Sequence, residues 1–171
     1  TALEARPTLA FHADFLRWML SDGAGAAFLS GTPPADRSAL RIDWIDPLSY
    51  ANELETCMYA GAVKNADGSL TGWRSFDSLR EAVSTNAFLT QQDVNLLNRE
   101  IIKTAVDRAL SRVIARHGIV PADVDWFLPH CSSDFFREPL RRRMEEIGFS
   151  IPPGRWFSNL ATKGNTGSAS I

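Results

Sequence analysis

The sequence predicts an α/β fold in which short buried strands, paired in parallel, alternate with helices. Three observations lead to this fold class. Residues 93–117 have a helical period over a long stretch, and residues 125–129 form a short apolar run bounded by turn residues. A second helical pattern then follows, and an apolar pair at residues 156–157 comes after it. A helix between successive short buried strands favours parallel pairing of those strands.

The first part of the chain begins with two predicted strands. The apolar run at residues 15–20 predicts a mostly buried strand, and the alternation of apolar and charged residues at 40–44 predicts a half-buried one. Between them, residues 21–23 are a turn signal, and the small residues that begin the segment 24–30, AGAAFLS, predict a close approach of the backbone to a neighbouring strand or a ligand. Residues 46–91 keep no period for long, so we expect an irregular excursion there.

Three helices are expected. A short one near residues 77–83 lies in the excursion, after a hairpin or exposed loop at 65–73. The clearest helix covers residues 93–117, where apolar residues recur at three-to-four spacing and a glycine follows as a natural stop. The last helix follows two serines, either of which could cap it. Because Pro139 is tolerated only in a first turn, this helix should start later than its apolar pattern suggests.

The composition is that of one ordinary globular domain. The 171 residues are 44% hydrophobic and 22% charged, and the net charge of −2 argues against a dedicated nucleic-acid-binding protein. Two cysteines, Cys57 and Cys131, are too few for a disulfide framework and favour a reducing, cytoplasmic location. The absence of a long apolar run predicts no membrane span. A start at Thr1 and a GNTGSASI ending nevertheless lead us to expect a fragment.

His130 is the first candidate for chemistry. It follows the predicted strand 125–129 and precedes a helix, and in open α/β folds functional groups collect at that edge of the sheet. A partly buried structural histidine is the alternative. Cys131 should point to the opposite side in an extended chain, which argues against a Cys131 nucleophile. Neither cysteine has a partner at metal-ligand spacing, so no metal site is expected.

The small-residue loop LATKGNTGSAS, residues 160–170, is the second candidate. Gly164 and Gly167 would let its backbone approach a ligand closely, and Asn165 could present its amide to an oxyanion. A flexible polar loop is the alternative. A phosphate-binding loop is not expected, because the lysine precedes the glycines instead of following them.

Basic residues cluster on the last predicted helix. Arg137, Arg141, Arg142 and Arg143 form either a solvated face, balanced by Glu145 and Glu146, or a contact surface for an acidic partner or a phosphorylated substrate arm.

Three segments, in this order, resemble the thiolase-fold condensing enzymes, and above all the 3-oxoacyl-carrier-protein synthase III group of ketosynthases. They are DGAGA at 22–26, DWFLPH at 125–130 and GNTGSASI at 164–171. The resemblance implies a thiolase-like layered fold that is only partly present.

The implied division of the chain has three parts. Residues 1–30 would end the N-terminal half of the fold, 31–91 would connect the halves, and 92–171 would form a truncated C-terminal half.

The resemblance implies a ketosynthase that condenses an acyl thioester with a malonyl- or β-ketoacyl-type thioester. His130 and Asn165 match the last two residues of the family's Cys-His-Asn triad, in which the histidine Nε2 and the asparagine amide donate hydrogen bonds to an oxyanion. The nucleophilic cysteine would lie upstream of this chain, so the chain alone should be inactive. A non-catalytic partner subunit of the same fold, or an acyltransferase that makes esters or amides, is the alternative.

The resemblance also implies partners. Coenzyme A or acyl-carrier-protein thioesters would be the substrates, with no other cofactor, and the full-length protein would be a homodimer. Arg141–Arg143 and Gly164 are the expected substrate or carrier contacts. Many relatives have His-Gln-Ala-Asn where this chain has HCSS at 130–133, and Gln91 and Gln92 replace a methionine and a glycine. These departures favour a branch that makes specialised lipids or polyketides over simple fatty-acid priming.

Overall fold

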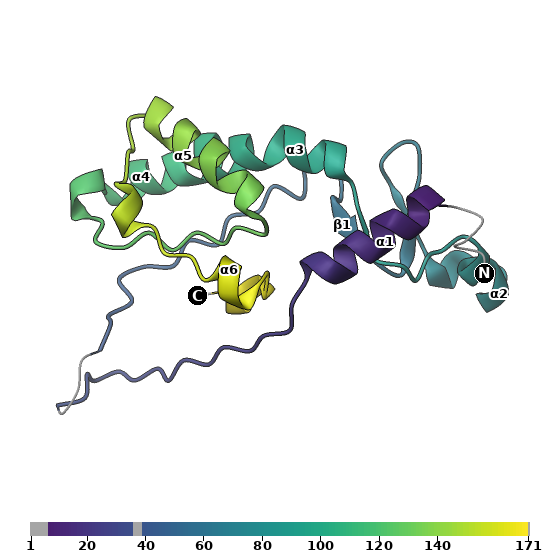
Figure 1. Cartoon of the computed structure of the whole chain (residues 1–171), viewed down its shortest axis with the longest axis horizontal. Helices are drawn as coiled ribbons and strands as arrows, with labels where there is room; N and C mark the ends of the chain where they lie inside the picture. The colour runs from purple at the N-terminus through teal and green to yellow at the C-terminus, as the bar shows by residue number, and fades with distance from the viewer. Residues whose placement is uncertain (1–6, 36–38, 171) are drawn as a thin grey trace.

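The structure of the protein is a computed structural model that describes residues 7–35 and 39–170 (Figure 1). It is mixed helix and strand, with two antiparallel two-stranded sheets and two isolated parallel bridges in the described part. This mixture of helices and strands is compatible with a layered α/β fold. The thiolase-like layering and the three-part division of the chain stay predictions. None of the helices in the described part has the length and apolar character needed to cross a membrane.

One long helical rod confirms the prediction for residues 93–117. It consists of α3 (Val94–Ile102), a π-helical stretch η2 (Lys103–Leu110) and α4 (Ser111–His117), which follow one another without a break. Asp93 caps its start, since the carboxylate accepts a hydrogen bond from the Leu96 N–H at 2.9 Å. Gly118 ends the rod in the left-handed conformation, with φ of 63°, which a glycine adopts without steric cost.

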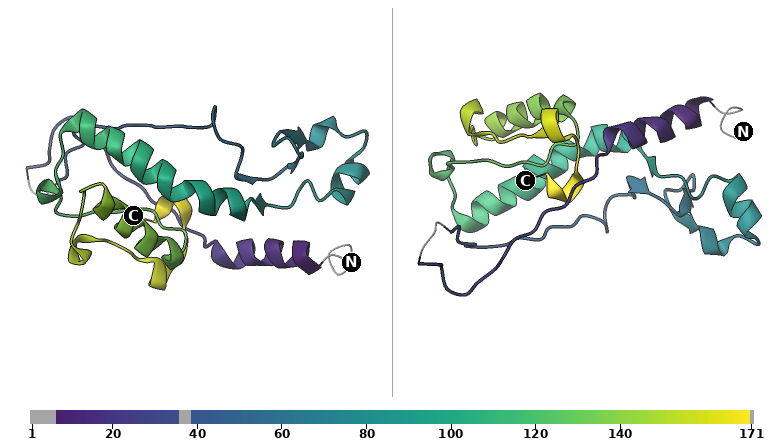
Figure 2. Two further views of the ribbon diagram at one scale, coloured as in Figure 1. Left: turned by 90° about the horizontal axis from the view of Figure 1, so that it is seen from above. Right: turned by 60° about the horizontal axis from the view of Figure 1, so that its bottom comes forward.

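The second helix packs beside this rod (Figure 2). It begins with a 3-10 turn, η4 (Asp134–Phe136), capped by Ser133, and continues as α5 (Arg137–Glu146). Pro139 lies in the first turn of α5, as predicted.

The core lies where η2, α5 and the chain after α5 meet. Its buried members come from these three segments: Val106, Met144, Phe149, Ile151 and Trp156. Phe127 and Trp156 form a parallel bridge across this core, so the predicted strands at 125–129 and near 156 pair in parallel, but over a single bridge.

The excursion contains the predicted hairpin and short helix. The hairpin pairs β2 (Ala62–Lys64) with β3 (Leu70–Gly72), and α2 (Leu79–Ser84) follows it. A second small sheet pairs β1 (Met58–Tyr59) with β4 (Gln91–Gln92), which returns the chain to the start of α3.

Both strands predicted near the N-terminus are wrong. Residues 15–20 belong largely to a helix, α1 (Pro7–Met19), in which Leu16 is buried and Trp18 is 85% exposed. A short apolar run does not distinguish a strand from a helix, and a proline at the first helical position was the overlooked signal. Residues 40–44 are extended but form no strand within the described part, and Leu40 is fully exposed. A strand requires a neighbour to complete its ladder of hydrogen bonds.

Side chains of residues 44–50 instead attach this part of the chain to the rod. In Figure 1 it passes below α4 on its way to the excursion. The buried carboxylate of Asp46 lies 2.7 Å from Arg116 Nη1 and 2.6 Å from His117 Nε2, and Trp44 stacks on His117 at 4.1 Å. Further along, the guanidinium of Arg108 lies over the ring of Tyr50. Residues far apart in sequence therefore fix the path of this segment.

The charge on Asp93 should make the stability of the rod depend on acid pH. Lys64 Nζ lies 2.8 Å from Asp93 Oδ2, and this contact, with the Leu96 N–H, lowers the pKa of Asp93. In acid, the unfolded chain therefore binds more protons at this residue than the folded chain does. The stabilisation by the charge is present above the unfolded pKa of about 3.9 and is lost as the pH falls through the lower pKa of the folded state. We expect Asp93→Asn, which keeps a capping side chain, to unfold at a lower temperature than the wild type at pH 7.

The measurement is the thermal midpoint of both proteins between pH 7 and pH 3. The difference should narrow as the pH falls through the titration of Asp93. Asp93→Ala, which also removes the cap, should cost about 1 kcal/mol in stability. A difference between wild type and Asp93→Asn that is independent of pH would contradict the role of the charge.

Candidate functional site

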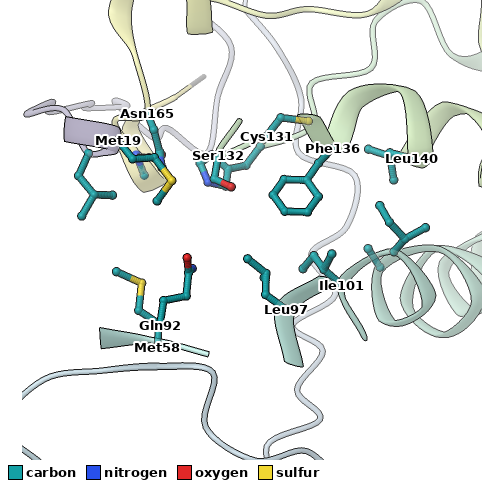
Figure 3. A pocket seen from close by; sticks show the side chains of 15 residues that line it. Met19, Met58, Gln92, Leu97, Ile101, Cys131, Ser132, Phe136, Leu140 and Asn165 are labelled. Atoms are coloured by element: carbon teal, nitrogen blue, oxygen red, sulfur yellow. Dashed lines mark hydrogen bonds between the residues drawn. The ribbon is translucent and has the colours of Figure 1, made fainter. Parts of the chain in front are cut away.

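The described part of the chain holds a cavity of about 380 Å³ beside the start of α3. Figure 3 shows two walls that face each other, one with Met58, Gln92 and Leu97, the other with Asn165 and the side chains near the start of α5. The lining is mainly apolar, with a few polar groups that include His130 and Asn165. Such a cavity suits an apolar ligand with one polar group that requires recognition.

The parallel pair at the core positions His130. The Phe127 N–H donates to Arg155 O at 2.8 Å, and the Phe157 N–H donates to Phe127 O at 2.9 Å. His130 follows this pair directly, where the chain turns towards α5, and its Nδ1 lies 2.9 Å from Ser170 Oγ. The histidine predicted at the end of the strand thus contacts the small-residue loop predicted as the second candidate.

Asn165 is the buried polar residue of this loop, with 4% of its surface exposed. Its backbone forms a parallel bridge with Leu20, and the Ser21 N–H donates to Asn165 O at 2.8 Å. The side-chain Oδ1 accepts a hydrogen bond from the Gly167 N–H at 3.1 Å. Because the carbonyl end of the amide serves that bond, the NH₂ end is the one available as a donor on the cavity wall.

Ser21 and Gly23, at the start of the DGAGA segment, lie close to the small-residue loop. A Cβ placed on Gly23 would lie 2.6 Å from Thr166 Cβ, and one placed on Gly164 would lie 2.2 Å from Ser21 Oγ. Gly164 also has a positive φ of 71°, which side chains rarely adopt. The close approach predicted for residues 24–30 is not found: these residues are exposed, and a Cβ on Gly25 would meet no described atom within 4 Å, so the contact lies at Ser21 and Gly23 instead.

Gly23 and Gly25 form a matched pair for testing this contact. At Gly25 an added Cβ would meet no atom of the described residues within 4 Å. We expect Gly23→Ala to displace Thr166 and lower the free energy of unfolding by about 1–3 kcal/mol, and Gly25→Ala to be near neutral. Chemical denaturation of the two variants measures this. Equal effects at both positions would show that the close approach does not constrain the segment.

Cys131 lines the cavity but does not have the character of a nucleophile. Burial raises the pKa of its thiol, which lowers the fraction of reactive thiolate. Cys57 lies elsewhere, where burial and the charge of Asp93 raise its pKa as well. Among residues 7–35 and 39–170, no three histidine, cysteine or carboxylate side chains gather in a way that could hold a metal ion.

Arg141, Arg142 and Arg143 of α5 differ in their contacts. Arg141 pairs with Glu138 and Glu145, and Arg143 pairs with Asp107 and Glu146. Arg142 is 69% exposed, and its nearest carboxylate, on Glu138, lies 3.7 Å away. A solvated, internally paired face therefore describes Arg141 and Arg143, whereas the charge of Arg142 is the most open to a partner.

Sequence reasoning missed two residues of this site. Gln92 points into the cavity from β4, and Ser170 contacts His130 (Figure 3 labels Gln92). The sequence signal for Gln92 was its position just before the long helix, where Gln91 and Gln92 replace the methionine and glycine of many relatives. Ser170 lay inside the candidate loop, but the sequence offered no reason to pair it with a histidine forty positions earlier.

Comparisons with known proteins point to one enzyme type. The chain is 27% identical over 157 residues to beta-ketoacyl-[acyl-carrier-protein] synthase III of Paracoccus denitrificans, which covers 90% of this chain and 40% of the relative. The corresponding protein of Cereibacter sphaeroides is 26% identical over 156 residues, with the same coverage. That of Chlamydia pneumoniae is 34% identical over 76 residues, or 43% of this chain and 21% of the relative.

No family model matches the chain. The chain spans about two fifths of the length of the first two relatives. These similarities support a distant, ketosynthase III-like relationship for this chain.

Proposed function

We propose that this chain carries the oxyanion-binding part of a ketosynthase III-like condensing site. The observation that carries the proposal is the meeting of His130 and Asn165 at one mainly apolar cavity, although they lie on separate segments. The apolar walls suit an acyl chain, and the two polar side chains suit the carbonyl oxygen of a thioester.

The proposed reaction has two stages. A cysteine from a segment outside this chain takes an acyl group from a thioester, with release of the free thiol. A malonyl-type thioester then loses CO₂, and the resulting enolate carbon attacks the acyl carbonyl and expels the cysteine thiolate. The Asn165 amide donates to the carbonyl oxygen on which negative charge develops, and such a pre-oriented donor is worth about 2.7–4 kcal/mol where measured.

The finer features follow from the same proposal. The substrates are coenzyme A or acyl-carrier-protein thioesters, no other cofactor takes part, and the complete protein is a cytoplasmic homodimer. Arg142 is the favoured contact for an acidic carrier protein, because Arg141 and Arg143 are paired within the chain. Gly164 supports the site through its close contact with Ser21 and not through a side chain. The departures at residues 131–133 and at Gln92 favour a role in specialised lipid formation.

Product analysis tests the proposal. The complete gene product that contains this sequence is incubated with an acyl-coenzyme A and malonyl thioester labelled at the free carboxyl carbon. We expect release of labelled CO₂ together with a β-ketoacyl thioester. An ester or amide product without CO₂ release would assign an acyltransferase instead. No acylation and no product unless a second subunit is added would assign a non-catalytic partner.

A further inference from the structure

We infer that Ser170 is a positioning residue that holds neutral His130 as the Nδ1–H tautomer and leaves Nε2 as a proton acceptor. The inference rests on the proposed function for its chemical meaning, but not for its test. Ser170, at the end of the small-residue loop, would thus orient the imidazole ring, and neutral His130 would accept a proton at Nε2 instead of donating one.

The tautomer follows from the number of protons in the hydrogen-bond chain. The Ser170 hydroxyl has one proton and donates it to Gly167 O, because a carbonyl oxygen can only accept. Ser170 Oγ therefore presents a lone pair to His130 Nδ1, which lies 2.9 Å away. If Nδ1 were unprotonated, its own lone pair would face the lone pair of Ser170 Oγ and the two would repel each other. Nδ1 therefore carries the proton.

The loop fixes the position of Ser170 Oγ. The Ser170 N–H donates to Gly167 O at 3.2 Å, which closes the turn η6 (Gly167–Ala169), and the Gly167 N–H holds Asn165 Oδ1. One peptide turn thus orients both polar groups of the site, the amide of Asn165 through its N–H and the ring of His130 through its C=O and Ser170. The two side chains should respond together when this turn is disturbed.

The chemical consequence is a division of labour between the two residues. Asn165 can donate to an oxyanion at once. Neutral His130 cannot donate from Nε2, so it first accepts a proton there, and the thiol of the proposed nucleophile is the chemical class that supplies it. The S–H bond breaks, the Nε2–H bond forms, and a thiolate and an imidazolium result. The imidazolium can donate from Nε2 during the acyl transfer, while Nδ1–H stays on Ser170 Oγ, and it then returns the proton to the thiolate that leaves, so His130 is neutral again at the condensation.

Nitrogen-15 NMR of the imidazole rings tests this inference on the chain itself. The chain has three histidines, so the spectrum contains three ring systems, and His130→Gln identifies the relevant one. At a pH where the ring is neutral, we expect Nδ1 of His130 to have the shift of a protonated nitrogen and Nε2 that of an unprotonated one. Wild-type His130 with its proton on Nε2 would overturn the inference.

Variants of the serine separate its effect from that of the fold. Ser170→Ala should let the His130 ring exchange between both tautomers, whereas Ser170→Thr should retain the Nδ1–H form. Ser168→Ala, at an exposed serine of the same turn, is the matched control and should leave the tautomer unchanged. The ring of His117, which is held by Asp46, reports whether each variant remains folded.

Each outcome decides the question. Ser170→Ala with an unchanged, fully Nδ1–H ring would show that Ser170 does not set the tautomer. If Ser170→Ala does not fold, the wild-type ring and Ser170→Thr still decide whether the hydroxyl holds Nδ1–H. Because the spectrum reads the tautomer without turnover, a negative product assay would overturn the proposed condensation and leave this result standing.

Discussion

Replacing Asn165 with alanine should lower the rate of condensation by about 10²–10³-fold in the complete gene product. The reason is that the amide NH₂ is a donor already oriented by the Gly167 N–H, so no reorganisation is needed when negative charge develops on the substrate oxygen. The rate of acyl transfer to the nucleophile should fall much less. The measurements are the rate of labelled CO₂ release and, separately, the amount of acyl-enzyme formed.

Two further variants isolate the donor. Asn165→Asp keeps the shape and an oxygen for the Gly167 N–H but replaces the donor with an acceptor, so condensation should be lost here as well. Asn159→Ala is the matched control, because Asn159 precedes α6 (Leu160–Lys163) without a side-chain capping bond. Condensation that proceeds at the wild-type rate in both Asn165 variants would remove Asn165 from the proposed mechanism.

Replacing Trp156 with alanine should lower the free energy of unfolding by about 3–5 kcal/mol. Trp156 is buried in the core, its Nε1–H donates to Ile151 O at 3.0 Å, and its ring meets that of Phe127 edge-on at 4.9 Å. The change would leave a large cavity and an unpaired carbonyl oxygen. It would also loosen the parallel pair that leads to His130, so the site should be disturbed together with the fold.

Denaturation with urea measures this effect. Trp126→Ala is the matched control on the neighbouring segment, because Trp126 is 61% exposed, and it should change the stability by less than about 0.5 kcal/mol. Trp156→Phe should lie between the two, since it retains much of the volume but loses the hydrogen-bond donor. A small effect of Trp156→Ala would mean that this core contributes little to the stability of the chain.

The effects expected at Asn165 and Trp156 concern residues that are joined by one series of contacts. Trp156 holds Phe127, Phe127 leads to His130, and His130 meets the loop that carries Asn165 through Ser170. Because packing of the core and geometry of the site are joined in this way, a variant at Trp156 should alter the His130 tautomer before the chain unfolds globally. The Gly23 contact supports the same loop from the side of the DGAGA segment.

Local signals in the sequence predicted the long rod, α2 and α5, but not α1 or α6. The rod over residues 94–117 was predictable because its apolar period and its terminal Gly118 lie in one continuous stretch. Pro139 likewise placed the start of α5. In contrast, the apolar run at residues 15–20 was consistent with either a helix or a strand. In the structure it is largely helical, and Leu16 is the one buried residue of the run.

The sequence by itself indicated two candidates for the chemistry, because His130 follows a predicted buried strand and Asn165 lies in a small-residue loop with the backbone freedom of glycine. The tertiary structure alone decided how they meet. The bridge between Leu20 and Asn165 and the contact between His130 and Ser170 join segments that are far apart along the chain. Such contacts depend on how the core packs. The spacing of residues along the chain does not show which side chains from distant segments will come within hydrogen-bond distance of each other.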